Sequence, residues 1–134
     1  AAAKDVRRAI KRVVASKGFR FEQLEGYRVG RTRGPVRRGV RSLFSNHSYG
    51  TAIDINRKHN GLYRRCKIPA EQLSGKRVSR CRLVHGGAWD PVKRPQTTIV
   101  PGSVVYDEFV RFWKWGGELN GSMKDFMHFS VTGR

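Results

Sequence analysis

The spacing of the hydrophobic residues changes along this chain, and this change constrains the fold more than any other feature. Between residues 4 and 17, apolar residues recur at the spacing of one helix face, with Lys and Arg around the rest. Residues 52–55 and 126–131 instead alternate between apolar and polar side chains, as half-buried strands do. Helices and strands that are separated along the sequence favour the α+β class.

Other segments give weaker signals for secondary structure. Gly18 is expected to end the first helix, and the alternation of Phe19 and Phe21 with charged residues predicts a short strand that leads into residues 26–29. Residues 28–41 contain six arginines, three glycines and a proline. This composition predicts a loop.

The second half of the chain is predicted to be rich in loops. Residues 56–101 are basic and punctuated by Gly and Pro, so we expect long loops with one short helix near residues 69–73. Aromatic residues at helical spacing predict a further helix over residues 106–115, closed by Gly116 and Gly117.

Length and charge limit the kinds of protein that this chain can be. Its 134 residues are enough for one domain, which we assign to residues 1–134. The 38% hydrophobic and 10% aromatic content exceeds that of a disordered basic tail, and no apolar run reaches the about 20 residues of a membrane-spanning helix. The formal net charge of +18 predicts polyanionic partners.

The two cysteines, Cys66 and Cys81, leave two alternatives open. They form either one disulfide, which would favour an oxidising compartment, or two free thiols, which would fit a cytosol. A structural zinc site that combines them with His59 and His85 has spacings that match no common pattern of zinc ligands.

Two segments each join a histidine to a carboxylate. The first is Ser-Asn-His-Ser-Tyr-Gly-Thr-Ala-Ile-Asp-Ile-Asn over residues 45–56, and the second is Trp-Gly-Gly at 115–117 followed by Lys-Asp-Phe-Met-His-Phe at 124–129. A catalytic zinc takes three protein ligands and keeps one position open for water. His47, Asp54 and His128 are a suitable set of ligands.

The pattern Ser-x-His-x-x-Gly-x-Ala-x-Asp with a distant Asp-x-x-His resembles the zinc peptidases of bacterial cell walls. These include the VanY-like D-Ala-D-Ala carboxypeptidases and the L-alanyl-D-glutamate endopeptidases of phage endolysins, and the endolysin branch is the more similar. The resemblance covers residues 26–56 and 101–131. It implies a small domain with a central antiparallel sheet, flanking helices and a zinc cleft on the sheet.

The resemblance also implies roles for individual residues. His47, Asp54 and His128 would bind Zn²⁺, and Asp125 would be the catalytic acid and base. An ideal strand would direct Asp125 and His128 to opposite faces, so we expect Asp125 in the turn just before the last strand.

An arginine upstream of the first motif usually completes such a site. Arg31 best matches its position, with Arg28 and Arg33 as alternatives. A guanidinium there would stabilise the negative charge that develops on the carbonyl oxygen. Ser45 either donates a hydrogen bond to the substrate or a ligand, or caps a turn.

The function implied is hydrolysis of a peptide bond in peptidoglycan stem peptides, with the L-alanyl-D-glutamate bond expected first and a D-Ala-D-Ala carboxypeptidase or dipeptidase as the alternative. The expected site of action is the cell wall, in the periplasm or outside the cell, or the host cytoplasm before release if the chain is a phage lysin. We expect a monomer whose basic surface attracts anionic cell-wall or outer-membrane polymers. A basic nucleic-acid-binding protein is the rival class, but no nucleic-acid-binding signature accompanies the charge.

Overall fold

The computed structural model describes residues 2–26, 33–37, 40–43 and 52–134. Its strands are β1 (Leu24–Glu25), β2 (Arg33–Arg37), β3 (Val40–Leu43), β4 (Ala52–Ile55), β5 (Leu62–Arg64), β6 (Arg82–His85), β7 (Lys114–Trp115), β8 (Lys124–Asp125) and β9 (His128–Ser130). Its helices are α1 (Ala2–Ser16), α2 (Gly75–Val78) and α3 (Val104–Phe109), with 3-10 helices η1 (Arg57–His59) and η2 (Ala70–Gln72).

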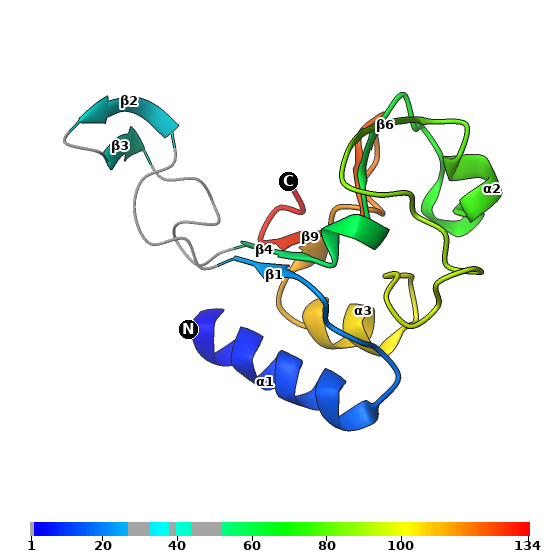
Figure 1. The fold of residues 1–134 in the computed structure, drawn as a ribbon, viewed down its shortest axis with the longest axis horizontal. Helices are drawn as coiled ribbons and strands as arrows, with labels where there is room; N and C mark the ends of the chain where they lie inside the picture. Colours follow the sequence, from blue (N-terminus) through cyan, green and yellow to red (C-terminus); the bar gives the residue numbers. More distant parts are fainter. Residues whose placement is uncertain (1, 27–32, 38–39, 44–51) are drawn as a thin grey trace.

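The strands form three antiparallel sheets. A four-stranded sheet has the order β1-β4-β9-β7, a three-stranded sheet has the order β6-β5-β8, and β2 pairs with β3. Helices α1 and α3 lie on the same side of the four-stranded sheet (Figure 1). The α+β class is therefore confirmed, with an antiparallel sheet at the centre.

The first helix is confirmed as an amphipathic element. Val6, Ala9 and Val13 of α1 are buried in the core, as its 3.6-residue period requires, while its Lys and Arg residues are exposed. Strand β4 is also confirmed, because Ile53 and Ile55 are buried between the sheet and the helices. Asp54 points to the opposite face of the strand.

A cluster of aromatic rings surrounds Phe126, which is fully buried. Trp89 stacks on Phe126 with ring centroids 4.5 Å apart, and Tyr63 meets the same ring edge-on at 5.6 Å. Trp115 contacts it from the four-stranded sheet at 5.7 Å. Since Phe126 lies between the last strands of the two larger sheets, this cluster fixes the sheets to one another.

Two predictions in the first half of the chain are wrong. Residues 28–41 were expected to be a loop, but Arg33–Arg37 pairs with Val40–Leu43 through backbone hydrogen bonds, which composition does not reveal. Phe19 and Phe21 lie outside the strands, with their rings packed edge-to-face at 5.4 Å, and the short strand begins later, at Leu24.

The second half contains more regular structure than expected. The short helix predicted near residues 69–73 is η2, but β5, β6 and α2 were not predicted within 56–101. The helix predicted over 106–115 ends at Phe109, because Trp115 lies in β7 and pairs with Phe129 of β9. The final strand is confirmed over His128–Ser130.

Cys66 and Cys81 form a disulfide, which settles the alternative that the sequence leaves open. It joins the end of β5 to the start of β6 and excludes a zinc site at these two sulfurs. Within the described residues, no helix has the length and apolar character needed to cross a membrane.

Candidate metal centre

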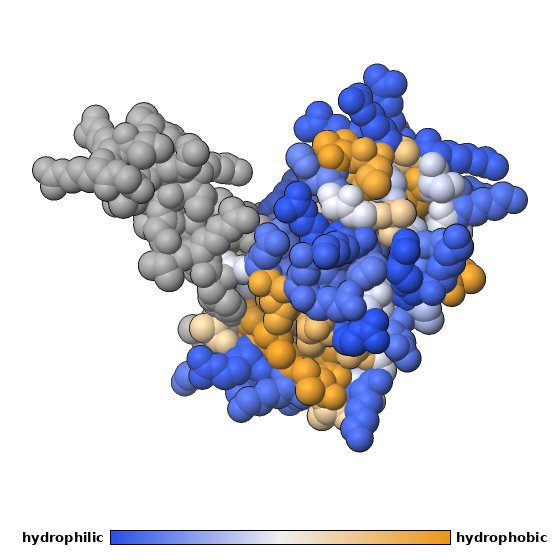
Figure 2. Space-filling view, in the orientation of Figure 1, coloured by the Kyte–Doolittle hydropathy of each residue, from blue (hydrophilic) through white to orange (hydrophobic). Residues whose placement is uncertain are grey.

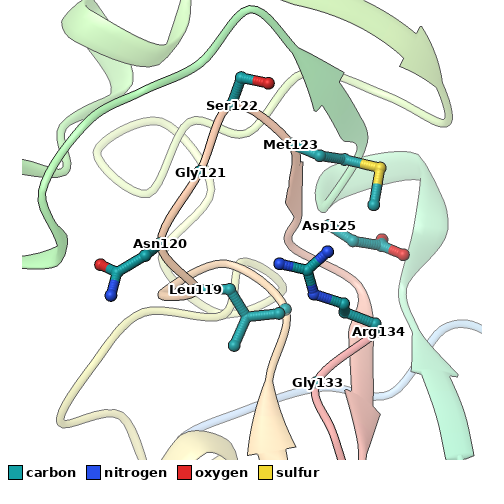
Figure 3. Close-up of a pocket in the computed structure, with 9 residues that line it drawn as sticks. Leu119, Asn120, Gly121, Ser122, Met123, Asp125, Gly133 and Arg134 are labelled. Atoms are coloured by element: carbon teal, nitrogen blue, oxygen red, sulfur yellow. The ribbon is translucent and has the colours of Figure 1, made fainter.

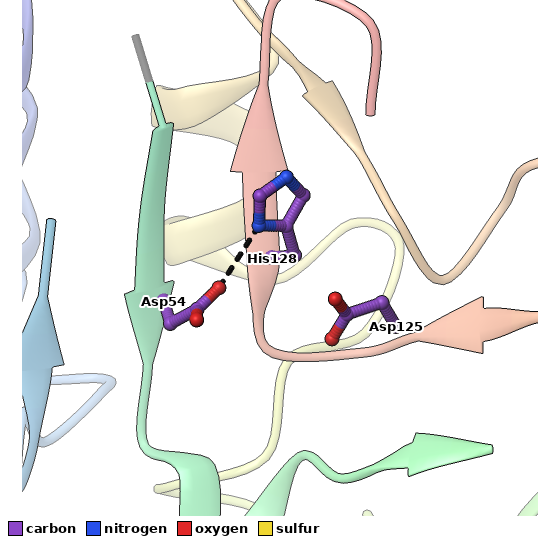
Figure 4. Close-up of side chains that lie close together, drawn as sticks. All are labelled: Asp54, Asp125 and His128. Atoms are coloured by element: carbon purple, nitrogen blue, oxygen red, sulfur yellow. Dashed lines mark hydrogen bonds and ion pairs between the residues drawn. The ribbon is translucent and has the colours of Figure 1, made fainter. Parts of the chain in front are cut away.

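Asp54 and His128 meet because their strands pair. The two residues are direct cross-strand partners in the register of β4 and β9, so their side chains emerge on the same face. His128 Nδ1 and Asp54 Oδ1 lie 2.9 Å apart in a hydrogen bond (Figure 4). The histidine side chain is 6% exposed and the carboxylate 17%, so both are largely removed from water.

Asp125 reaches the same place from the other sheet. It is the last residue of β8 and pairs with Leu62 of β5, after which the chain crosses to β9 within two residues (Figure 4). Ligand atoms of Asp54, Asp125 and His128 all lie within 4.8 Å of one another. Asp125 was expected in the turn just before the last strand, but it is the last residue of β8, and the turn follows it at residues 126–127.

Three hydrogen bonds hold residues 126–127, where the chain crosses between the two sheets. The Phe126 amide donates to the carbonyl of Gly61 at 3.1 Å, and the Phe126 carbonyl accepts from the Trp115 indole at 2.8 Å. The Ile55 amide donates to the carbonyl of Met127 at 2.9 Å. Asp125 and His128 are thus held on either side of a buried, fully bonded segment.

Gly116 connects both functional strands through its backbone. Its amide donates to the carbonyl of His128 at 2.8 Å, and its carbonyl accepts from the Asp125 amide at 3.1 Å. A Cβ at this position would lie 2.5 Å from the Asp125 carbonyl oxygen and 3.1 Å from Asp125 Cβ. The predicted helix-closing role of Gly116 is therefore wrong, since the glycine permits close approach behind the candidate site.

Asn56 fixes the chain directly after β4. Its backbone is left-handed, with φ of 47°, and its side chain is fully buried. The Asn56 carbonyl oxygen Oδ1 accepts from the amides of Glu22 and Gln23, while Nδ2 donates to the carbonyls of Arg20 and Thr97. These four bonds anchor the end of the strand that carries Asp54.

Asp125 is harder to ionise in this buried place, next to the carboxylate of Asp54. Burial, followed by the negative charge of Asp54, raises the pKa of Asp125 to about 7. Burial alone would lower the pKa of His128, but the hydrogen bond and charge of Asp54, with the charge of Asp125, raise it instead. The group thus concentrates negative charge next to an imidazole.

A divalent cation fits this group chemically. The buried oxygen Oδ1 of Asp125 has no hydrogen-bond partner among the described residues, although burial of such an atom is costly. One imidazole and two carboxylates are ligand types that zinc accepts in catalytic sites. A bound cation would also offset the charge of the two carboxylates.

Asp125 is in the lining of two pockets. One, of about 170 Å³, lies between the loop of residues 119–123 and the final residues 133–134 (Figure 3). The other contains Asp54 and extends toward His85 of β6. Lys124, only 2% exposed, donates a hydrogen bond from Nζ to the carbonyl of Leu119, which lines the first pocket.

Several residues predicted for the site lie outside the described residues: Arg28, Arg31, Ser45 and His47. Arg33, the other alternative to Arg31, lies in β2. His59 and His85 do not join the metal group. His59 Nε2 contacts Glu22 Oε1 at 2.6 Å, and His85 is exposed on β6.

Three residues that build the site were not predicted from the sequence: Gly116, Lys124 and Asn56. Each lies inside or beside a quoted motif, which was a usable signal. Trp113, Trp115 and Phe109 are core residues, because all three are buried.

The comparisons with known proteins point to one family. A family profile described as D-alanyl-D-alanine carboxypeptidase matches residues 38–131, which is more than half of the chain. No curated protein and no solved structure matches the chain significantly.

Proposed function

Because the chain belongs to the D-alanyl-D-alanine carboxypeptidase family, we propose that it is a zinc-dependent peptidase that cleaves the L-alanyl-D-glutamate bond of peptidoglycan stem peptides. The family supports a peptidase that acts on peptidoglycan at the cell wall. The observation that carries the proposal is the convergence of Asp54, Asp125 and His128 within 4.8 Å. Zinc and the particular bond are inferences beyond the family.

Asp54 and His128 would hold the zinc ion, together with His47. The first two come from paired strands of the central sheet, so their separation is fixed by backbone hydrogen bonds rather than by loops. When bound, zinc supplies Lewis acidity that makes water a nucleophile at neutral pH.

Asp125 would move the proton during hydrolysis. One carboxylate oxygen, Oδ1, takes a proton from the attacking water as the hydroxide oxygen bonds to the scissile carbonyl carbon. The same carboxyl group then gives that proton to the amide nitrogen as the C–N bond breaks. Asp125 is in the lining of both pockets, which supports this role, because the two halves of a substrate need space around the reacting atoms.

Arg31 would stabilise the negative charge on the carbonyl oxygen during the reaction, with Arg28 and Arg33 as alternatives. Ser45 would donate a hydrogen bond to the substrate. These assignments rest on the sequence motif. Single substitutions of the three arginines by Gln would separate them, because only the functional one should lower turnover strongly.

Residues 1–134 would form one catalytic domain. The packing of α1 against α3 supports this, because it joins the N-terminal helix to the part that the family profile covers. The Cys66–Cys81 disulfide supports action in an oxidising compartment, such as the periplasm or the cell exterior.

The test is digestion of purified peptidoglycan, followed by mass analysis of the fragments. Cleavage of the L-alanyl-D-glutamate bond should release peptides that begin with D-glutamate and should require zinc. The family description favours a second candidate, a D-Ala-D-Ala carboxypeptidase, which would release only free D-alanine from pentapeptides. Undigested peptidoglycan with a zinc-loaded protein would contradict both.

A further inference from the structure

Basic residues surround the disulfide between β5 and β6. We call residues 64–67 and 80–82 the cationic ribbon; they read Arg-Arg-Cys-Lys and Arg-Cys-Arg, so five of the seven are basic and none is acidic. All five basic residues are exposed. The disulfide, with a Cα–Cα distance of 5.0 Å, keeps the two segments adjacent.

Arg64 and Arg82 are placed directly opposite one another. They are cross-strand partners in the register of β5 and β6, so their side chains emerge on the same face. Like charges in this position oppose pairing of the strands. Within the part of the chain that the structure describes, neither forms an ion pair with a carboxylate.

Arg65 adds a second unusual feature at the same place. Its backbone is left-handed, with φ of 52°, a conformation that residues with large side chains rarely adopt. Two unfavourable features therefore occur around one disulfide: the repulsion between Arg64 and Arg82, and the uncommon backbone conformation of Arg65. Such local costs are common at binding sites.

We propose that the cationic ribbon binds a phosphate-bearing anionic polymer of the cell envelope. Four of its five basic residues are arginines, whose planar guanidinium groups form paired hydrogen bonds with phosphate oxygens. A repeating phosphodiester would place successive charges along the two strands and relieve the repulsion between Arg64 and Arg82. The envelope as the location of the polymer rests on the proposed function.

The cationic ribbon lies in the part of the fold that also carries Asp125. Strand β5 pairs with β6 on one edge and with β8 on the other, so Arg64 and Arg82 of the ribbon belong to the same three-stranded sheet as Asp125. Hydrophilic side chains protrude around β6 and α2 in Figure 2, where the polymer would have access. Bound polymer would therefore hold the candidate active site close to the wall.

The test measures affinity for synthetic poly(glycerol phosphate) by fluorescence anisotropy. Arg64→Gln/Arg82→Gln should weaken binding at least about tenfold and reduce its dependence on salt. The control, Arg7→Gln/Arg8→Gln, removes the same charge from the exposed face of α1 and should change the affinity less than about twofold. Lys67→Gln/Arg80→Gln provides a second ribbon variant, and a thermal melt of each protein checks the fold.

Equal losses in the ribbon and control variants would overturn the proposal, because diffuse charge would then explain the binding. Tighter binding of duplex DNA with the same number of phosphates would also overturn it, in favour of a nucleic-acid partner. Hydrolysis of a short soluble stem peptide should be unchanged in Arg64→Gln/Arg82→Gln. Ribbon-dependent polymer binding without hydrolysis by any of these proteins would instead contradict the proposed function alone.

Discussion

Asp125 combines a buried, unbonded oxygen with a position beside two pockets, which suits a group that exchanges protons with a substrate. Asp125→Asn keeps the size of the side chain but removes the proton acceptor. We expect kcat on a soluble stem peptide to fall by about 10²–10⁴-fold, with the fold and zinc content retained. Asp107→Asn, which alters an exposed carboxylate on α3, is the control. Wild-type turnover of Asp125→Asn would remove this residue from the mechanism.

His128 is expected to be required for metal binding rather than for proton transfer. His128→Ala deletes one ligand from the proposed set, so the zinc affinity should weaken by at least about 100-fold. Metal analysis of the purified proteins after dialysis measures this, with His85→Ala as a control at an exposed histidine. A fully loaded and active His128→Ala protein would show that the zinc site lies elsewhere.

Individual site residues could be predicted where they are part of one of the two histidine–carboxylate motifs. Asp54 and His128 were both named from sequence, and the register of β4 and β9 explains why they meet. Gly116 and Lys124 were not assigned to the site, because their contributions depend on contacts with distant segments. A backbone bond to His128 or to Leu119 leaves no periodic signal in the sequence.

The β7–β9 pairing and the β8–β9 crossing depend on the absence of a side chain at Gly116. Gly116→Ala would press a methyl group against the Asp125 carbonyl, because the new methyl carbon would lie 2.5 Å from the carbonyl oxygen. We expect the free energy of unfolding to fall by about 1–3 kcal/mol and turnover to fall with it, because Asp125 must shift. Urea unfolding and peptide hydrolysis measure the two effects.

Gly18→Ala is the matched control for this substitution, because its nearest atoms would be 3.8 Å from the new methyl group. It should leave turnover unchanged. Equal effects of the two substitutions on turnover would indicate that Gly116 does not position Asp125.

Helices and strands were predicted correctly only where the element was long enough for the spacing of its hydrophobic residues to be visible. Helix α1 has 15 residues, β4 alternates over residues 53–55, and both were predicted. Strands β7 and β8 have two residues each, and β5 has three, which is too short for alternation to be visible. The helix predicted over 106–115 was too long because the aromatic residues after Phe109 serve the shared core rather than a helix face.

Most of the residues that give the net charge of +18 lie away from the candidate metal centre. The residues that hold Asp54, Asp125 and His128 in place are mostly apolar or bonded through their backbones, while Lys and Arg are distributed over α1, the ribbon and the loops. Substrate cleavage and attachment to the wall can therefore respond differently to the same change of solvent. Ionic strength is the variable that separates them.

Salt should reduce activity on intact cells far more than activity on a short soluble peptide. Raising the salt concentration from 0.1 M to 1 M shortens the Debye length from about 10 Å to about 3 Å, which weakens long-range attraction to an anionic wall. Contacts inside a largely buried site are screened much less. Both substrates are assayed in the same buffers, with zinc content checked at each concentration. Equal sensitivity to salt on the two substrates would show that charge acts within the cleft, through an arginine such as Arg31 or through the substrate itself.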